Sequence, residues 1–296
     1  MPARHPSHIE RSLTQRHEQY RQRLATTSVH AKRLLDSGQL AASQLRERSG
    51  RLLAGIGLTG SLLLNSVVGP LAGPVTAQTQ ALRQDFAVSL KESLAKVTPT
   101  QPAKLSSDQA EKIEKVIYEQ TSVVAKAKLE GQELNHQVGY IGYEQHLSRF
   151  PGDRLELHDE EQVAGIAPGL GAWGYFASSK EAFTETDHRR EKYYAVAQVQ
   201  WLPDFNQNVR FYSNWYKYRK ILIVNPANGQ AVVTEMGDVG PAKWTGKQFG
   251  ASPEAMKALK LHLGPRKGLV IFMFIDDPNN QVPLGPLTEP LQLPQA

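Results

Sequence analysis

The sequence contains no cysteine, so it has neither a disulfide framework nor a thiolate metal site. It also lacks a phosphate-binding glycine-rich motif and the Gly-x-Ser-x-Gly turn of many hydrolases. None of the nine histidines forms a His-x-x-x-His pair. The run at residues 276–280 is rich in oxygen ligands but lacks the spacing of a calcium loop, and it predicts a turn. We therefore expect no metal ion and no cofactor.

Charged residues are absent from residues 52–82 and are concentrated before them. Residues 1–51 hold ten Lys/Arg against four Asp/Glu, whereas the rest of the chain is close to neutral. The net charge of +5 is therefore due to this basic arm. Phosphate binding requires basic side chains clustered on a folded face, so we expect no nucleic-acid partner.

An uncharged apolar segment follows the arm, from Leu52 to Val75. About 20 apolar residues span a bilayer as a helix, and basic residues on one flank predict that this flank stays inside. The pattern favours a signal anchor over residues 52–78, with residues 1–51 as a cytoplasmic arm and membrane contact through residues 52–75. The alternatives are a long signal peptide cleaved near Ala77, or a glycine-rich buried helix. We expect a membrane-anchored or secreted protein whose folded domain lies outside the cytoplasm.

Residues 79–135 have the pattern of a helical stalk or linker. Residues 79–97 are predicted to be helical, and Pro99 and Pro102 interrupt the pattern. A second, amphipathic helix is predicted to start near Ser107 and to end near Gly131. Its apolar face consists of Ile113, Val116, Ile117, Val124 and Ala127. This helix has the length of a stalk or of a packing arm.

Residues 163–290 are rich in short β-type runs separated by turns. The expected strands are Tyr193–Trp201, Lys220–Val224, Ala231–Met236 and Leu269–Ile275, with an Asn-Gly turn at residues 225–229. A short helix is predicted after Ser252, the N-cap residue, with proline at its first position. Short strands with one inserted helix predict a small β-barrel, so the expected fold class is α+β.

Three motifs follow one another within residues 221–275. They are Asn225-Pro226-Ala227-Asn228-Gly229, then Asp238-Val239-Gly240-Pro241, then Ala251-Ser252-Pro253-Glu254-Ala255-Met256-Lys257-Ala258-Leu259. In order and spacing they resemble the double-psi β-barrel domain of rare-lipoprotein-A-like lytic transglycosylases and, more distantly, of expansins. The resemblance implies a double-psi-like barrel, a bacterial cell-wall context and peptidoglycan or another wall glycan as the partner.

The sequence departs from this family at positions that bear on catalysis. Gly250 stands where the family has an acid before its helix, and Val239 replaces the arginine of the Asp-Arg-Gly-Pro motif. A histidine usual before a Leu-Pro pair has no counterpart near Leu202-Pro203, where residues 198–201 read Gln-Val-Gln-Trp. Two functions therefore remain open: a peptidoglycan lytic transglycosylase, and a non-catalytic module that binds or loosens the wall. An interaction domain without a glycan ligand is a third.

Cleavage of a glycosidic bond requires a carboxyl that can protonate the leaving oxygen. Asp238, at the end of a predicted strand, is the candidate catalytic residue; the alternative is an aspartate that caps the turn. Glu235 is close enough in sequence to share a groove with it and is a candidate for substrate binding. Glu254 is better explained as an acid at a helix N-terminus.

Aromatic side chains can pack against the C–H faces of sugars. Trp244 and Trp215 have polar neighbours in the sequence and are the candidates for glycan contact, together with Tyr216. The alternative for each is a place in the core of a small barrel.

Overall fold

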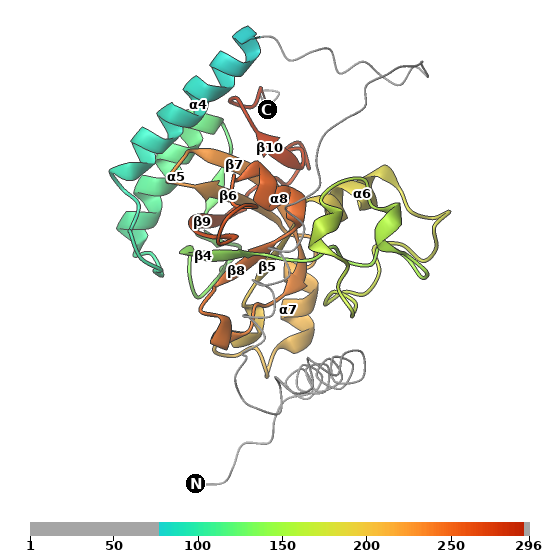
Figure 1. Cartoon of the computed structure of the whole chain (residues 1–296). Helices are drawn as coiled ribbons and strands as arrows, with labels where there is room; N and C mark the ends of the chain where they lie inside the picture. The colour runs from blue at the N-terminus through green and yellow to red at the C-terminus, as the bar shows by residue number, and fades with distance from the viewer. Residues whose placement is uncertain (1–76, 293–296) are drawn as a thin grey trace, which may run out of the picture. The chain divides into compact units, whose positions relative to one another are not determined.

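The computed structural model describes residues 77–292 (Figure 1). The predicted basic arm and most of the apolar segment, including residues 52–75, lie outside the described residues. Within residues 77–292, no helix is both long enough and apolar enough to span a membrane.

Six strands form a closed barrel. They are β4 (Val138–Tyr143), β5 (Tyr194–Ala197), β6 (Lys220–Asn225), β7 (Gln230–Val239), β8 (Phe249–Ala251) and β9 (Lys267–Ile275). Around the barrel the order is β4-β8-β5-β7-β6-β9, and β9 pairs again with β4. The pairs β4–β8 and β5–β7 are parallel, and the other four are antiparallel. The α+β prediction with a small β-barrel is confirmed, and the barrel is compatible with a double-psi topology.

The hairpin between β6 and β7 has the predicted turn. Asn225 pairs with Gln230, and the Asn225 side chain accepts a hydrogen bond from the N–H of Ala227. Gly229 has φ of 71°, and a Cβ at this position would lie 1.8 Å from the carbonyl oxygen of Ala87. Glycine is therefore required both by the turn and by the helix that packs on it.

Short strands and turns extend the barrel. β1 (Ala125–Lys126) pairs with β9, and β10 (Gly285–Leu287) pairs with β7. β2 (Lys128–Leu129) and β3 (Gln132–Glu133) form a separate small hairpin.

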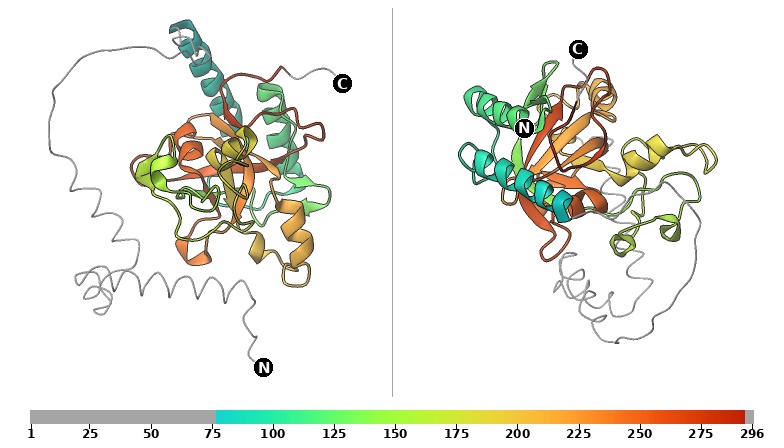
Figure 2. Two further views of the ribbon diagram at one scale, coloured as in Figure 1. Left: turned by 90° about the vertical axis from the view of Figure 1, so that its right-hand side faces the viewer. Right: turned by 90° about the horizontal axis from the view of Figure 1, so that it is seen from above.

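Two helices cover the outer face of β6, β7 and β9: α4 (Ala77–Ala95) and α5 (Ser107–Thr121) (Figure 2). Ser106 caps α5, which ends at Thr121 rather than near Gly131 because Ser122 adopts φ of 60° and the chain then enters β1. The shared core includes Leu90, Leu94, Ile113, Ile117, Leu222, Val233, Ile271 and Met273. The helices of the predicted stalk or packing arm thus pack against the barrel.

The barrel interior is filled by the strand residues that alternate with those facing the helices. Phe249 stacks on Phe272 with ring centroids 4.2 Å apart. Tyr216, at the end of α7 (Val209–Tyr216), is fully buried and contacts the Phe274 ring. Since Phe272 and Phe274 both face inward, α7 helps to close the barrel.

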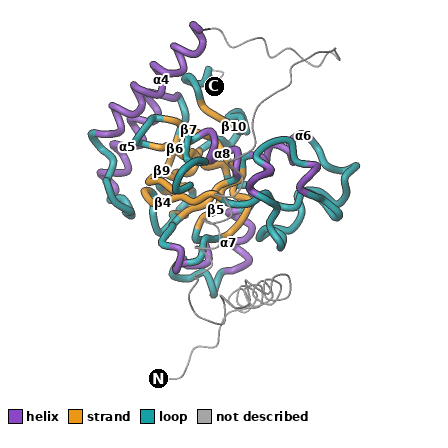
Figure 3. The backbone as a smooth tube through the Cα atoms, viewed as in Figure 1, coloured by secondary structure: helices purple, strands orange, loops and turns teal. Residues whose placement is uncertain are grey.

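Residues 144–192 form a long insertion between β4 and β5, which is mostly irregular (Figure 3). The insertion contains η1 (Leu155–Leu157), η2 (Gln162–Ala164) and α6 (Glu185–Lys192). It lies on the side of the barrel opposite α4 and α5 (Figures 1 and 2). Because β4 belongs to the barrel, the barrel domain includes residues before 163, where the sequence texture changes.

Three further short helices follow β5 in the chain. η3 (Val199–Trp201) comes directly after β5, η4 (Lys243–Thr245) lies between β7 and β8, and α8 (Pro253–Ala258) follows β8. Ser252 caps α8 by accepting the N–H of Ala255, and proline occupies the start of the helix as predicted.

Candidate functional site

Asp238, the predicted catalytic acid, is held by backbone groups at the end of β7. Its Oδ1 accepts hydrogen bonds from the N–H of Ala172 at 2.7 Å and from the N–H of Val239 at 2.8 Å. The first bond connects the barrel to the insertion. Asp238 therefore has the capping geometry that was the alternative to catalysis.

Glu235 does not share an open groove with Asp238. Its side chain is buried and receives a hydrogen bond from Nε of Arg190 at 2.7 Å. Burial raises the pKa of Glu235, and the Arg190 guanidinium opposes this shift. The residue thus fixes α6 against β7 through an ion pair.

Trp215 and Tyr216 are integrated into the end of the barrel. Nε1 of Trp215 donates to Glu130 at 2.9 Å, its ring packs edge-on against Phe274, and the Arg219 guanidinium lies 4.2 Å from the ring centroid. Tyr216 has no exposed surface. Tyr216 therefore belongs to the barrel core, which was the alternative to glycan contact. The ring of Trp215 is held in place by contacts on three sides.

Trp244 is the predicted aromatic residue that remains exposed, with 76% of its surface accessible. It lies in η4, on the loop between β7 and β8. Nε2 of Gln198 donates to the carbonyl oxygens of Pro241 and Lys247, both at 3.0 Å, and so joins the two ends of this loop. Gln198 opens the stretch that has no counterpart of the histidine in the resembled family, and here it positions the loop.

A small hollow lies beside this loop. It is lined by Leu134, Asn135, His136, Gln198, Gln248 and Phe249, and we call it the amide hollow. Three of these side chains are amides. Burial lowers the pKa of His136, which keeps its imidazole neutral near pH 7. No Asp, Glu, Lys or Arg of the described chain lines the hollow.

Gly250 occupies the position at which the resembled family has an acid. A Cβ built on Gly250 would lie 2.5 Å from Oε1 of Glu144 and 2.8 Å from its Cγ. The space next to the β8 backbone is therefore already filled by the side chain of Glu144, which follows β4. A carboxylate lies near this position although the sequence places glycine there.

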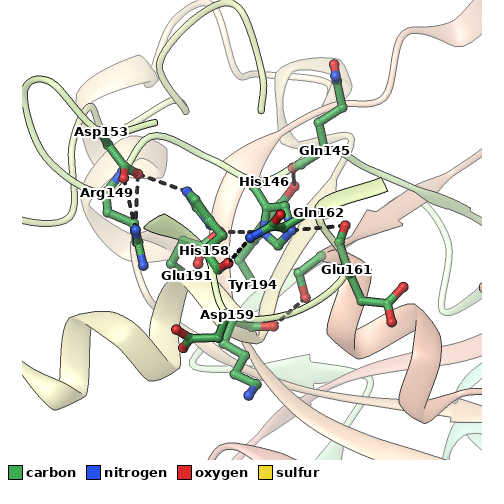
Figure 4. Close-up of polar contacts among 12 residues, drawn as sticks. Gln145, His146, Arg149, Asp153, His158, Asp159, Glu161, Gln162, Glu191 and Tyr194 are labelled. Atoms are coloured by element: carbon green, nitrogen blue, oxygen red, sulfur yellow. Dashed lines mark hydrogen bonds and ion pairs between the residues drawn. The ribbon is translucent and has the colours of Figure 1, made fainter. Parts of the chain in front are cut away.

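A second cluster of functional groups lies inside the insertion, where His146, His158 and Glu191 meet (Figure 4). Oε1 of Glu191 is 3.1 Å from Nδ1 of His146 and 3.5 Å from Nδ1 of His158. The two imidazole centroids are 4.4 Å apart. The three side chains are between 0% and 3% exposed, so the cluster is closed to solvent.

Both imidazoles also have a hydrogen-bond acceptor on their other side. Nε2 of His146 is 3.3 Å from the carbonyl oxygen of Glu161, and Nε2 of His158 is 3.0 Å from Oδ2 of Asp153. Asp153 in turn receives two hydrogen bonds from the Arg149 guanidinium, at 3.1 and 3.0 Å. The contacts form a continuous chain of polar groups from Arg149 to Glu161.

The electrostatics of the cluster follow from these contacts. Burial alone would raise the pKa of Glu191, but its contacts with His146 and His158 outweigh burial and lower it. For His146, burial favours the neutral form, yet Glu191 shifts the net pKa upward. Glu254, in the first turn of α8 as predicted, has its pKa raised to about 7 by burial.

The sequence-based search for metal ligands did not find this cluster. His146 and His158 lie in irregular chain and Glu191 lies in α6, so no local spacing relates them. The folding of the insertion brings them together. The sequence showed only isolated His and Glu residues in a loop-rich segment. Such residues do not indicate which of them lie together in the fold.

The chain matches no protein-family model, and no curated protein matches it. The described residues form an α+β domain: a closed six-stranded barrel, two helices on one side and the insertion on the other.

Proposed function

We propose that this domain is a non-catalytic module that binds a wall glycan outside the cytoplasm. The supporting observation is the amide hollow, whose polar lining consists of Asn135, Gln198, Gln248 and a neutral His136. Sugar hydroxyl and N-acetyl groups are neutral donors and acceptors, so amide and imidazole groups can pair with them. A lining without charge offers no counterion for a phosphate.

The exposed Trp244 supports the same proposal. It lies four residues before Gln248 on the loop that Gln198 holds. A tryptophan ring that is 76% exposed can cover the C–H face of a sugar at little structural cost.

Binding fits better than catalysis because the predicted acids are engaged in structural contacts. Asp238 accepts two backbone N–H groups, and Glu235 is paired with Arg190. Neither residue lines the amide hollow. The resemblance to wall-acting barrels supports the choice of glycan as the ligand.

The proposed location depends on the basic arm and the apolar segment before the described residues. An enzymatic reporter fused after Ala296 should be active only outside the cytoplasm. Activity of a reporter that works only in the cytoplasm would contradict this location.

Binding is tested by sedimentation of the full chain with purified peptidoglycan. His136→Ala and Trp244→Ala should each weaken binding by about fivefold or more, equivalent to about 1 kcal/mol, with little change in Tm. Phe211→Ala is the matched control, because Phe211 is 48% exposed on α7 and does not line the hollow. Unchanged sedimentation of both the His136 and the Trp244 variant would contradict the proposal.

A second function, lytic transglycosylation, is favoured by the position of Glu144 against Gly250. One carboxyl can suffice for this reaction, because a hydroxyl of the sugar itself attacks the anomeric carbon. The glycosidic C–O bond breaks as the new one forms, and the carboxyl passes the hydroxyl proton to the leaving oxygen. In this alternative Glu144 supplies the acid that the family has at the position of Gly250.

Release of anhydro-sugar products from peptidoglycan separates the two functions. If the domain is an enzyme, Glu144→Gln should reduce product release by roughly 10²–10⁴-fold while sedimentation with the wall persists. Asp238→Asn tests the predicted acid in the same assay. If the wild-type protein sediments with the wall but releases no product between about pH 4 and 8, the enzymatic function is excluded and the binding function is retained.

A further inference from the structure

The histidine cluster has an arrangement of acceptors that suits the binding of a cation. Each imidazole lies between two oxygen acceptors: Glu191 faces both Nδ1 atoms, while Glu161 and Asp153 face the Nε2 atoms. A neutral imidazole has only one N–H. When Nε2 of each ring donates to its oxygen partner, both Nδ1 lone pairs are directed toward the carboxylate of Glu191.

This arrangement matches the first coordination sphere of a transition-metal ion. One nitrogen of each imidazole and a carboxylate oxygen of Glu191 all lie within 4.8 Å of one another. Zinc bonds to nitrogen and oxygen of 2.0–2.1 Å place tetrahedral ligands about 3.3 Å apart. The observed Nδ1–Oε1 distances of 3.1 and 3.5 Å bracket that value.

The outer contacts are also those that support metal-bound histidines. A ligating imidazole typically donates its other N–H to a carboxylate or a backbone carbonyl, which fixes both tautomer and orientation. His158 has Asp153 in this role, and His146 has the carbonyl of Glu161. The bidentate contact with Arg149 orients Asp153 in its turn.

Glu254 provides an independent observation. It is 7% exposed, and its Oε2 has no hydrogen-bond partner in the described chain. Burial raises its pKa and the charge of His146 opposes this shift, so Glu254 lies near the cluster. A divalent cation between the two imidazoles would balance the buried carboxylate of Glu191, while Arg149 already balances Asp153.

We propose that His146, His158 and Glu191 bind a structural divalent cation, with zinc as the ion that best fits these ligands. A water molecule completes the coordination. The ligands come from the chain after β4, from the residue after η1 and from α6, so the ion joins distant parts of the insertion. The three side chains are between 0% and 3% exposed, so a substrate cannot reach the ion, and its role is structural.

The test uses the full chain, treated with a chelator and then titrated with Zn²⁺ or Co²⁺ alone. We expect one tight equivalent by calorimetry, four-coordinate Co²⁺ absorption bands, and a Tm increase of roughly 5 °C or more at saturating metal. His158→Gln and Glu191→Gln should abolish the tight equivalent and the Tm increase. Four histidines precede residue 77 and can bind metal weakly. The comparison of the wild type with the His158 and Glu191 variants therefore shows which binding belongs to the cluster.

His188→Gln is the matched control. His188 lies on α6 with Glu191, is 28% exposed on its side chain, and pairs with the exposed Asp159 at 2.9 Å. This variant should keep the tight equivalent. If the ligand variants fail to fold, the wild-type titration still decides the matter. Wild-type protein with the same Tm in zinc and in chelator, and with no tight equivalent, would overturn the proposal and leave the cluster as a hydrogen-bonded ion network.

Discussion

At the scale of single residues, the two tryptophans considered for glycan contact differ sharply in environment. Trp215 packs against Phe274, lies under Arg219 and donates to Glu130, whereas most of the Trp244 surface is exposed. Trp215→Ala should therefore lower the free energy of unfolding by about 2–4 kcal/mol. Trp244→Ala should change it by less than about 0.5 kcal/mol. Urea denaturation of the two variants measures both values, and equal losses would contradict these environments.

Gly250 allows a residue-scale test of how closely the Glu144 side chain packs against the β8 backbone. Gly250→Asp should lower the free energy of unfolding by about 2 kcal/mol, because its Cβ would meet Glu144 at 2.5 Å. Adding Glu144→Ser should recover at least half of that loss. Glu144→Ser alone serves as the reference. A Gly250→Asp variant as stable as the wild type would show that the Glu144 side chain moves away without cost.

At the scale of elements, the chain after β9 is anchored by a buried ion pair. Nζ of Lys220, in β6, donates to Oδ2 of Asp277 and to the carbonyl of Val282. Burial alone would raise the pKa of Asp277, but Lys220 and the N–H groups of Gln281 and Val282 lower it. The Asp277 side chain is 6% exposed, so the pair is largely shielded from solvent.

The lowered pKa gives a pH prediction with a defined sign. Asp277 contributes stability above its unfolded pKa of about 3.9, and that contribution is lost as pH falls through the lower folded pKa. Asp277→Asn should cost about 3 kcal/mol at pH 7, because Lys220 remains buried without its partner. The loss should shrink as pH falls below about 4. Denaturation curves at several pH values check this, and a pH-independent loss would contradict it.

The elements also show which features the sequence could specify. β6, β7 and β9 were predicted because they are continuous apolar runs, buried on both faces between the barrel interior and the helices. β4 and β8 are rich in glycine, which has low strand propensity, and their pairing is fixed by distant partners. The predicted Tyr193–Trp201 strand shortens to β5 because Gln198 leaves the ladder to hold the 240–248 loop.

The site was less predictable than the fold for a similar reason. Asp238 belongs to a motif that is contiguous in the sequence, and Trp244 follows that motif closely; the structure places them at a strand end and in an exposed loop, respectively. The amide hollow and the histidine cluster join segments that are far apart in the chain. No spacing rule connects such segments, since the irregular insertion decides which side chains meet.

At the scale of the whole molecule, α4 and α5 are part of the domain core. Ile117→Ala should lower the free energy of unfolding by about 3 kcal/mol, because Ile117 is fully buried against the barrel. Tyr118→Ala is the matched control, since the neighbouring side chain is 57% exposed. Thermal denaturation of both variants checks the prediction. Equal stability of the two variants would contradict the packing of α5.

The closure of the barrel has a consequence for the time course of folding. β4 is synthesised early, but it pairs with β8 and β9, which are synthesised much later. Gly139 therefore cannot pair before Val270 has been synthesised, and Ile141 cannot pair before Phe249 has been synthesised. Folding dominated by such distant contacts is slow, because a long loop must close before any pairing is gained. A growing chain that has not reached Ile275 therefore cannot complete the barrel. If the domain is exported as proposed, this delay keeps the chain unfolded while it crosses the membrane, and folding begins only after the last strand has arrived.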